Sequence, residues 1–207
     1  MNITIYRLVN FNNLNFFSQD LKHLIFQYKF NNKVNNIPLG ITDITFGNKF
    51  NQIVDNLPST LLNLTFGFSF NCTVDNLPKS LQNLTFGWMF NCIVDNLPHG
   101  ILNLTFGYEF NQPVNNLPLT LQNLSFGHKF NQSVDNLPQT VLNLTFGYNF
   151  NQLLDNLPNT IISIKFESQY INGCTMFNKQ LNCLSNSVSE LILPKNYNHE
   201  IKKIPFS

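Results

Sequence analysis

Charged residues are scarce in this chain of 207 residues, at 11% of the composition, where soluble proteins typically have roughly 25%. The 12 Lys and Arg residues nearly balance the 11 Asp and Glu residues, for a formal net charge of +1, and the basic residues are scattered. A surface that binds nucleic acid or an anionic membrane concentrates basic side chains. The composition therefore predicts neither as a partner.

Long hydrophobic runs are also missing. No stretch approaches the ~20 apolar residues that a membrane-spanning helix needs. The first residues, MNITIYRLVNFNNLNFF, lack the basic segment and uninterrupted apolar run of a signal peptide. We therefore expect a soluble, intracellular protein, most simply a cytoplasmic one, and we expect it to be a monomer.

Cysteine is limited to four residues, and none of them stands in the C-x-x-C spacing of a zinc site. They are Cys72, Cys92, Cys174 and Cys183. Cys72 and Cys92 lie twenty residues apart at the same position of two neighbouring repeats, so stacking of the repeats could bring them together. In a reducing compartment we expect free thiols, and the sequence leaves open whether these two pair.

The residue combinations that mark an enzyme are absent. The histidines His23, His99, His128 and His199 stand at unrelated positions, and no G-x-x-x-x-G-K-[ST] phosphate loop occurs. The carboxylates lie mainly in one repeated position, without the contrast of environments that separates a general acid from a base. We predict no catalytic activity and no cofactor.

Repetition with a period of twenty residues is what the chain has in abundance. The unit is F-N-x-x-[VL]-[DN]-N-[LI]-P-x-x-[LIV]-x-x-[LI]-x-F-G-x-x, and it occurs seven times without an insertion, with Glu167 in place of the Gly in the last copy. Its first Phe recurs at Phe30, Phe50, Phe70, Phe90, Phe110, Phe130 and Phe150. Such a period indicates a solenoid, in which each unit buries its apolar side chains against its neighbours.

Each unit has room for one short strand and no helix. The alternation of Leu64, Thr65 and Phe66 suits a strand with Leu and Phe facing inward. Pro58 fits an extended return path, and Asp55 with Asn56 fits a turn. We predict a repeat solenoid with one short parallel β-strand per 20-residue repeat, extended or 3₁₀-like return segments and little regular α-helix.

The ends of the array depart from the repeat. Residues 1–23 keep the apolar spacing without Asn-Leu-Pro, which indicates a degenerate capping repeat. Residues 24–169 hold the regular repeats. Residues 170–207 begin with seven extra residues, 170–176, which form either a bulged or a functional loop, and continue as degenerate repeats that act as a cap.

The stretch Leu57-Pro58-x-x-Leu61-x-x-Leu64-x-Phe66 resembles the core of a leucine-rich repeat, and the whole unit resembles the FNIP repeat of amoebae and giant viruses. The resemblance implies a leucine-rich-repeat-like solenoid that binds proteins without catalysis. It also implies a host protein as one candidate partner, and the host cytoplasm as the location if the chain is viral. The usual asparagine ladder position is variable here, so we expect the Asn71 or Asn76 position to replace it.

The position after the repeated Gly is the strongest candidate for a binding site, because it is mostly aromatic and differs between repeats. Its aromatic members are Tyr28, Phe68, Trp88, Tyr108, His128 and Tyr148. Aromatic side chains along one face could form the centre of a protein interface or a platform for sugar rings. They could also only shield the strand edge against one another.

Two other positions are uniform and polar. The position before Leu64 is Asn from Asn63 to Asn143, and the position after it is Thr or Ser from Thr45 to Thr145. The repeated Asp could suggest a calcium ladder, but the G-G-x-G-x-D loops of calcium-binding β-rolls are absent. We therefore expect solvated carboxylates that cap turns and no metal.

Three functions are consistent with these patterns. The leading hypothesis is a non-catalytic scaffold that binds an unidentified protein through one elongated face of the solenoid. The second is a module that binds a glycan or another repetitive polymer through the aromatic, Asn and Thr positions. The third is a purely structural repeat protein without a dedicated partner.

Overall fold

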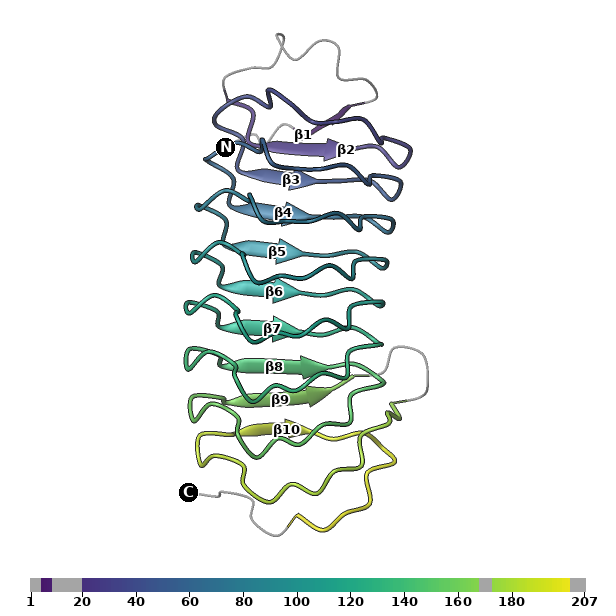
Figure 1. Ribbon diagram of the computed structural model, residues 1–207, viewed down its shortest axis with the longest axis vertical. Helices are drawn as coiled ribbons and strands as arrows, with labels where there is room; N and C mark the ends of the chain where they lie inside the picture. Colours follow the sequence, from purple (N-terminus) through teal and green to yellow (C-terminus); the bar gives the residue numbers. More distant parts are fainter. Residues whose placement is uncertain (1–4, 9–19, 168–172, 202–207) are drawn as a thin grey trace.

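A computed structural model of the chain describes residues 5–8, 20–167 and 173–201. Its strands form one parallel sheet of ten strands in chain order (Figure 1). The strands are β1 (Ile5–Leu8), β2 (His23–Phe26), β3 (Asp43–Thr45), β4 (Asn63–Thr65), β5 (Asn83–Thr85), β6 (Asn103–Thr105), β7 (Asn123–Ser125), β8 (Asn143–Phe146), β9 (Ser163–Phe166) and β10 (Glu190–Ile192). The described residues contain no helix and thus none that could cross a membrane. The predicted solenoid with one short strand per repeat is confirmed.

Neighbouring turns are stacked in strict register. Leu64 pairs with Leu84 and Leu84 pairs with Leu104, and from β2 to β9 each strand residue pairs with the residue twenty positions later. Between β1 and β2 the offset is 18, from Ile5 to His23. Between β9 and β10 the register instead joins Ile164 to Leu191, an offset of 27 residues that fits the seven extra residues expected at 170–176. Residues 9–19 and 168–172 lie outside the described residues, and the division of the chain into caps and regular repeats stays a prediction.

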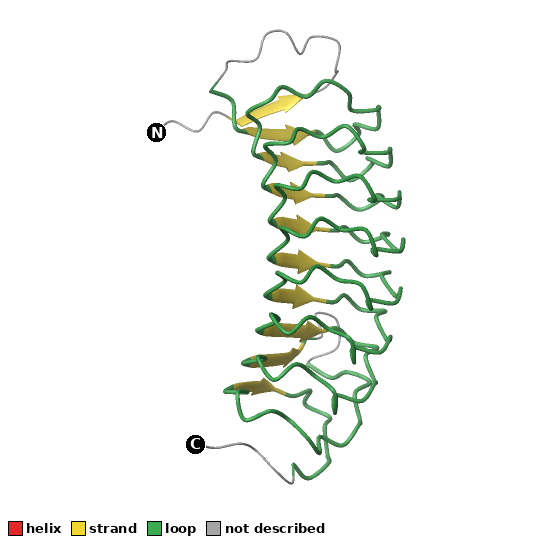
Figure 2. Cartoon of the chain, turned by 60° about the vertical axis from the view of Figure 1, so that its left-hand side comes forward, coloured by secondary structure: helices red, strands yellow, loops and turns green. Residues whose placement is uncertain are grey.

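The stack of turns is bent into an arc. Figure 2 shows the strands along the inner side of the arc and the loops along the outer side. Phe rings of successive turns are 5.6 Å apart at Phe86 and Phe106, next to the strands, and 6.0 Å apart at Phe90 and Phe110. The turns therefore stand slightly further apart at the second Phe, which agrees with the bend.

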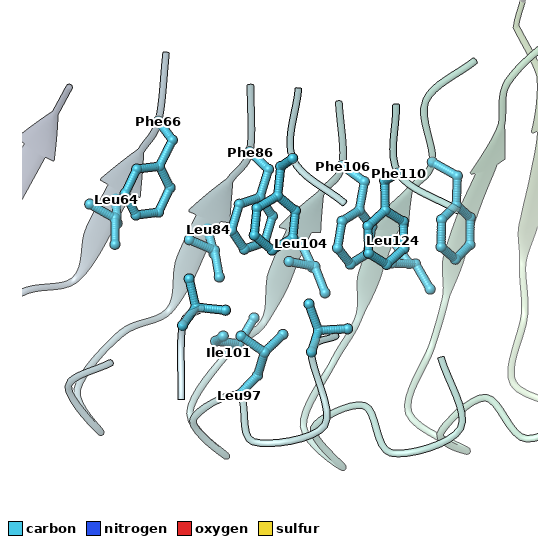
Figure 3. Packing of buried hydrophobic residues seen from close by; sticks show 14 of the residues in the cluster. Leu64, Phe66, Leu84, Phe86, Leu97, Ile101, Leu104, Phe106, Phe110 and Leu124 are labelled. Carbon is cyan, nitrogen blue, oxygen red and sulfur yellow. The ribbon is translucent and has the colours of Figure 1, made fainter. Parts of the chain in front are cut away.

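Two columns of Phe rings fill the core. Within one turn Phe86 and Phe90 are stacked with their centroids 3.7 Å apart, and both side chains are buried. Leu84, Leu104 and their equivalents close the core on the strand side (Figure 3). The buried Phe rings thus contact their own turn and the neighbouring turns, so the turns stabilise one another cooperatively.

The return segments are extended and carry isolated turns instead of a continuous 3₁₀ helix. Asp55 and Asn56 form the predicted turn. A second turn is closed by the N–H of Leu61, which donates to the carbonyl of Pro58 at 3.1 Å. The paths of successive turns then coincide, so their polar groups can bond from turn to turn.

Asparagine ladders connect the turns at three positions. The Oδ1 atom of Asn51 accepts the backbone N–H of Asn71 at 2.9 Å, and the same bond recurs along the column, which confirms the ladder predicted there. At the Asn76 position the side chain of Asn96 donates to Asp75 of the previous turn at 3.0 Å. The strand asparagines form the third ladder, in which Asn143 donates to Asn123 at 2.6 Å.

Candidate functional site

The aromatic position after the repeated Gly forms a stack of rings along five successive turns. The rings lie face to face at centroid distances of 5.6, 4.0, 4.3 and 4.8 Å, with interplanar angles between 3° and 19°. The members of this aromatic stack are, in order, Phe68, Trp88, Tyr108, His128 and Tyr148. The structure therefore brings together five of the six predicted site residues.

Tyr28 stands apart from the aromatic stack. The turn between Tyr28 and Phe68 carries Asn48 at this position, and Tyr28 is 58% exposed. Phe68, at the first end of the stack, is 45% exposed, whereas the four rings that follow it are half-buried. The stack thus begins at Phe68.

Close approach of the backbones at the repeated Gly puts the rings in contact. A Cβ atom on Gly107 would lie 1.9 Å from the carbonyl oxygen of Gly87, far inside any allowed contact. Because no side chain fits between these turns, Trp88 and Tyr108 follow directly after two backbones that touch. The rings can then stack at 4.0 Å.

An open groove of about 260 Å³ runs along the aromatic stack from β5 to β9. Four columns line it: the rings from Trp88 to Tyr148, the glycines from Gly87 to Gly147, the hydroxyl side chains from Thr105 to Thr145, and the residues Phe86, Phe106 and Phe126. Glu167 stands at the end of the groove. The groove therefore offers an apolar side formed by rings and a polar side formed by hydroxyl groups.

The position after the aromatic residues borders the stack, and the predicted aromatic column did not include it. Met89 is 42% exposed. On the next two turns Glu109 accepts a hydrogen bond from the Nζ atom of Lys129 at 2.7 Å, and this Nζ atom lies 5.9 Å from the centroid of the Tyr108 ring. The variability of this position from Lys49 to Asn149 was the signal that could have identified it.

His128 lies within the stack in a way that favours its neutral form. Its ring is 4.3 Å from Tyr108 and 4.8 Å from Tyr148. Burial lowers the pKa of His128, the nearby Lys129 lowers it further, and Glu109 acts in the opposite direction. The surroundings of His128 in the stack therefore favour the uncharged imidazole.

The same repeats identify the protein family. The model of the FNIP Repeat family matches residues 33–69, 68–108, 92–129 and 130–169. The chain belongs to the FNIP repeat family. No curated protein matches it.

Among solved structures, this FNIP repeat protein is similar to CroV588 of the giant virus CroV, described as a novel circular LRR protein structure. The two share 36% sequence identity with a TM-score of 0.78. The match covers 94% of the present chain and 33% of CroV588. The chain thus spans one third of the length of that protein, and the similarity shows a leucine-rich-repeat-like solenoid.

Two of the repeated Asp residues of this FNIP repeat protein take part in hydrogen bonds within the repeats. Asp75 accepts a hydrogen bond from Asn96 at 3.0 Å, and Asp135 accepts one from Ser133 at 2.7 Å. Within residues 5–8, 20–167 and 173–201, no group of three or more His, Cys, Asp or Glu side chains is placed to hold a metal ion. These carboxylates therefore already have hydrogen-bonding roles within the repeats.

Proposed function

We propose that this FNIP repeat protein is a monomeric, non-catalytic scaffold that binds a protein partner through the groove along its aromatic stack. The observation that carries the proposal is the arrangement of the rings, which are rigid, half-buried and aligned beside an open groove. Large apolar side chains that are already held in place lose little conformational entropy when a partner binds. The stack is therefore preorganised for association.

The composition around the groove is that of a protein interface. Phe68, Trp88 and Met89 combine aromatic and Met side chains that remain exposed or half-exposed, and these residue types are enriched at the centres of interfaces. The ion pair of Glu109 and Lys129 stands beside them, where it would form part of a polar rim. We expect Trp88 to contribute most to affinity.

Binding of a glycan or another repetitive polymer is a second candidate, and the geometry of the rings favours it less. A sugar ring or a base stacks on a free aromatic face. In the stack the faces of Trp88, Tyr108 and His128 are directed at the next ring on each side. Mainly ring edges remain for a ligand, and these suit the side chains of a protein.

Affinity capture tests the proposal. The full chain is immobilised and used to retain proteins from a lysate of the source or host cells, and the affinity of a retained protein is then measured. We expect Trp88→Ala and Tyr108→Ala to weaken its binding by roughly tenfold or more. The matched control is Tyr28→Ala, which removes an aromatic residue of the same column outside the stack. Equal binding by all three variants would refute the proposed site.

The fluorescence of Trp88 separates protein binding from glycan binding. Trp88 is the one tryptophan of the chain, so its emission reports on the groove alone. Titration with a panel of oligosaccharides is expected to leave the emission unchanged, whereas the captured protein shifts it. A saturable change with an oligosaccharide would favour the second candidate. If the wild-type chain retains no protein at all, the purely structural hypothesis is favoured.

A further inference from the structure

Cys72 and Cys92 replace the residue that other turns carry at the same position. In successive turns this position holds Asn32, Gln52, Cys72, Cys92, Gln112, Gln132 and Gln152. From Gln52 to Gln152 every turn carries Gln at this position except two adjacent turns, which carry Cys. The two substitutions stand side by side in the solenoid.

The Gln side chains donate hydrogen bonds to an Asn of the preceding turn. The Cys thiols donate to the Asn at the equivalent position, but a thiol is a weaker donor than an amide. The Nε2 atom of Gln112 donates to Oδ1 of Asn91 at 3.2 Å. The Sγ atoms of Cys72 and Cys92 lie 3.2 Å and 3.3 Å from the equivalent Oδ1 atoms of Asn51 and Asn71. Because a thiol is a weak donor, hydrogen bonding alone gives no advantage to Cys over Gln here.

The repeat holds the two thiols in the same orientation one turn apart. Phe70 and Phe90, two residues before each Cys, have ring centroids 6.0 Å apart, and successive turns are in register. This ring distance measures the spacing of the two turns. Disulfides join Cα atoms that are roughly 4.4–6.8 Å apart, so turns spaced in this way are compatible with a link. Both side chains are half-buried against the core, and rotation about χ1 would turn one Sγ atom towards the other.

We propose that Cys72 and Cys92 form a reversible disulfide that links two neighbouring turns, with a small-molecule disulfide such as glutathione disulfide as the oxidant. The thiolate of one Cys attacks the oxidant, which releases one glutathione and leaves a mixed disulfide. The thiolate of the second Cys then attacks the protein sulfur and displaces the second glutathione. The protein loses two protons and two electrons, and one glutathione disulfide becomes two glutathione molecules.

The bond would act on the turn that carries Trp88, the second ring of the aromatic stack. The chain from Cys72 to Cys92 includes Trp88 and Met89. A cross-link between its ends restricts the unfolded chain and thereby stabilises the folded turn. Oxidation thus holds Trp88 in place irrespective of whether the groove binds a protein.

Peptide mapping of the full chain provides the test. Cleavage after Lys49, Lys79 and Lys129 places Cys72 in peptide 50–79 and Cys92 in peptide 80–129, because no other Lys or Arg lies between them. The reduced protein is treated with glutathione disulfide, its remaining thiols are alkylated, and it is digested without reductant. We expect a linked pair of these two peptides that dithiothreitol separates. Two alkylated peptides, two separate glutathione adducts or a link to Cys174 or Cys183 would overturn the proposal.

The variants Cys72→Gln and Cys92→Gln are matched controls, because they restore the residue that the other turns carry and should fold. They are expected to form no linked pair. The unfolding temperature of the wild-type chain should rise on oxidation by on the order of 5–10 °C and fall again with dithiothreitol, while that of the variants stays constant. Equal oxidation effects in wild type and Cys72→Gln would show that no stabilising link forms.

Discussion

The rings of Trp88 and Tyr108 lie 4.0 Å apart and within 3° of parallel, although twenty residues separate them in the chain. Their contact follows from the touching backbones of Gly87 and Gly107 immediately before them. The candidate binding surface is therefore a product of the same close stacking that forms the core. Changes to the stacking and changes to the surface can be told apart by experiment.

Gly107→Ala is expected to destabilise the solenoid and disturb the stack. Its Cβ atom would meet the carbonyl oxygen of Gly87 at 1.9 Å, and relief of this clash requires the two turns to separate. We expect a loss of about 3 kcal/mol in the free energy of unfolding and a red shift of Trp88 emission, measured by urea unfolding and fluorescence. Thr105→Ala, at an exposed strand position of the same turn, is the control. An alanine variant of Gly107 as stable as this control would contradict the predicted close packing.

Phe90→Ala is expected to show the largest effect of a single core truncation. Phe90 is fully buried and stacks on Phe86 at 3.7 Å. Removal of its ring leaves a cavity between turns and should lower the free energy of unfolding by about 3–5 kcal/mol, measured by denaturant titration. The adjacent Met89→Ala, at an exposed side chain, should change stability by less than about 1 kcal/mol. Similar losses in both variants would be inconsistent with the two Phe columns forming the core.

The strand asparagine ladder has a direction, which a substitution by Asp tests. Asn103 donates to Asn83 and accepts from Asn123, so Asn103→Ala removes both bonds and should cost about 1–2 kcal/mol. At neutral pH the carboxylate of Asn103→Asp can accept but cannot donate, and it faces the Oδ1 atom of Asn83. We expect this variant to be less stable than the Ala variant at neutral pH. Acidification should reverse the order, because a protonated carboxyl group can donate.

The attachment of β10 is expected to weaken in acid. Glu190 of β10 accepts a hydrogen bond from Ser163 at 2.7 Å and pairs with Lys165 at 3.0 Å, both in β9, and these two contacts lower the pKa of Glu190. A lowered pKa in the folded state means that the stabilisation is present at neutral pH and is lost as the pH falls through that pKa, below the ordinary carboxyl value of about 4.3.

Hydrogen exchange of the β10 amides reports this loss. Their protection, corrected for the intrinsic exchange rate, should fall between about pH 6 and about pH 3, and fall less in Ser163→Ala, which lacks the hydroxyl donor. The amides of β6, in the middle of the sheet, serve as the internal reference. Acid-independent protection of β10 in the wild-type chain would argue against a stabilising role for Glu190.

Three of the thiols, those of Cys72, Cys92 and Cys183, should differ in their rates of alkylation. Burial raises the pKa of the Cys72 and Cys92 thiols, and the thiolate is the reactive form. Cys183 is exposed. With iodoacetamide near neutral pH we expect Cys183 to react several-fold faster than Cys72 or Cys92, followed by mass spectrometry of the three tryptic peptides. The rates of Cys72 and Cys92 should keep rising as the pH is raised. A uniform rate at all three sites would contradict the burial of the pair.

The amino-acid sequence by itself determined the turn and its stacking. The twenty-residue period leaves no room for a helix, the alternation around Leu64 specifies a strand, and identical turns must bury Phe66 and Phe70 against their equivalents. The sequence also predicted the column that holds Trp88, because aromatic residues that vary between otherwise uniform repeats are visible without coordinates. These features depend on the spacing of residues along the chain, which can be read from the sequence directly.

Only the tertiary structure decided how the aromatic rings of this column are oriented. Whether Trp88 and Tyr108 expose their ring faces or their ring edges to a ligand depends on the distance and tilt between turns. The curvature of the whole stack sets both quantities, and no single repeat specifies them. The same stacking leaves Met89 exposed next to Trp88 and puts Cys72 and Cys92 at the same position of neighbouring turns. A repeat pattern fixes which residues share a column, but the orientation of their side chains is a property of the assembled solenoid, since each one is held by the turns on both sides of it.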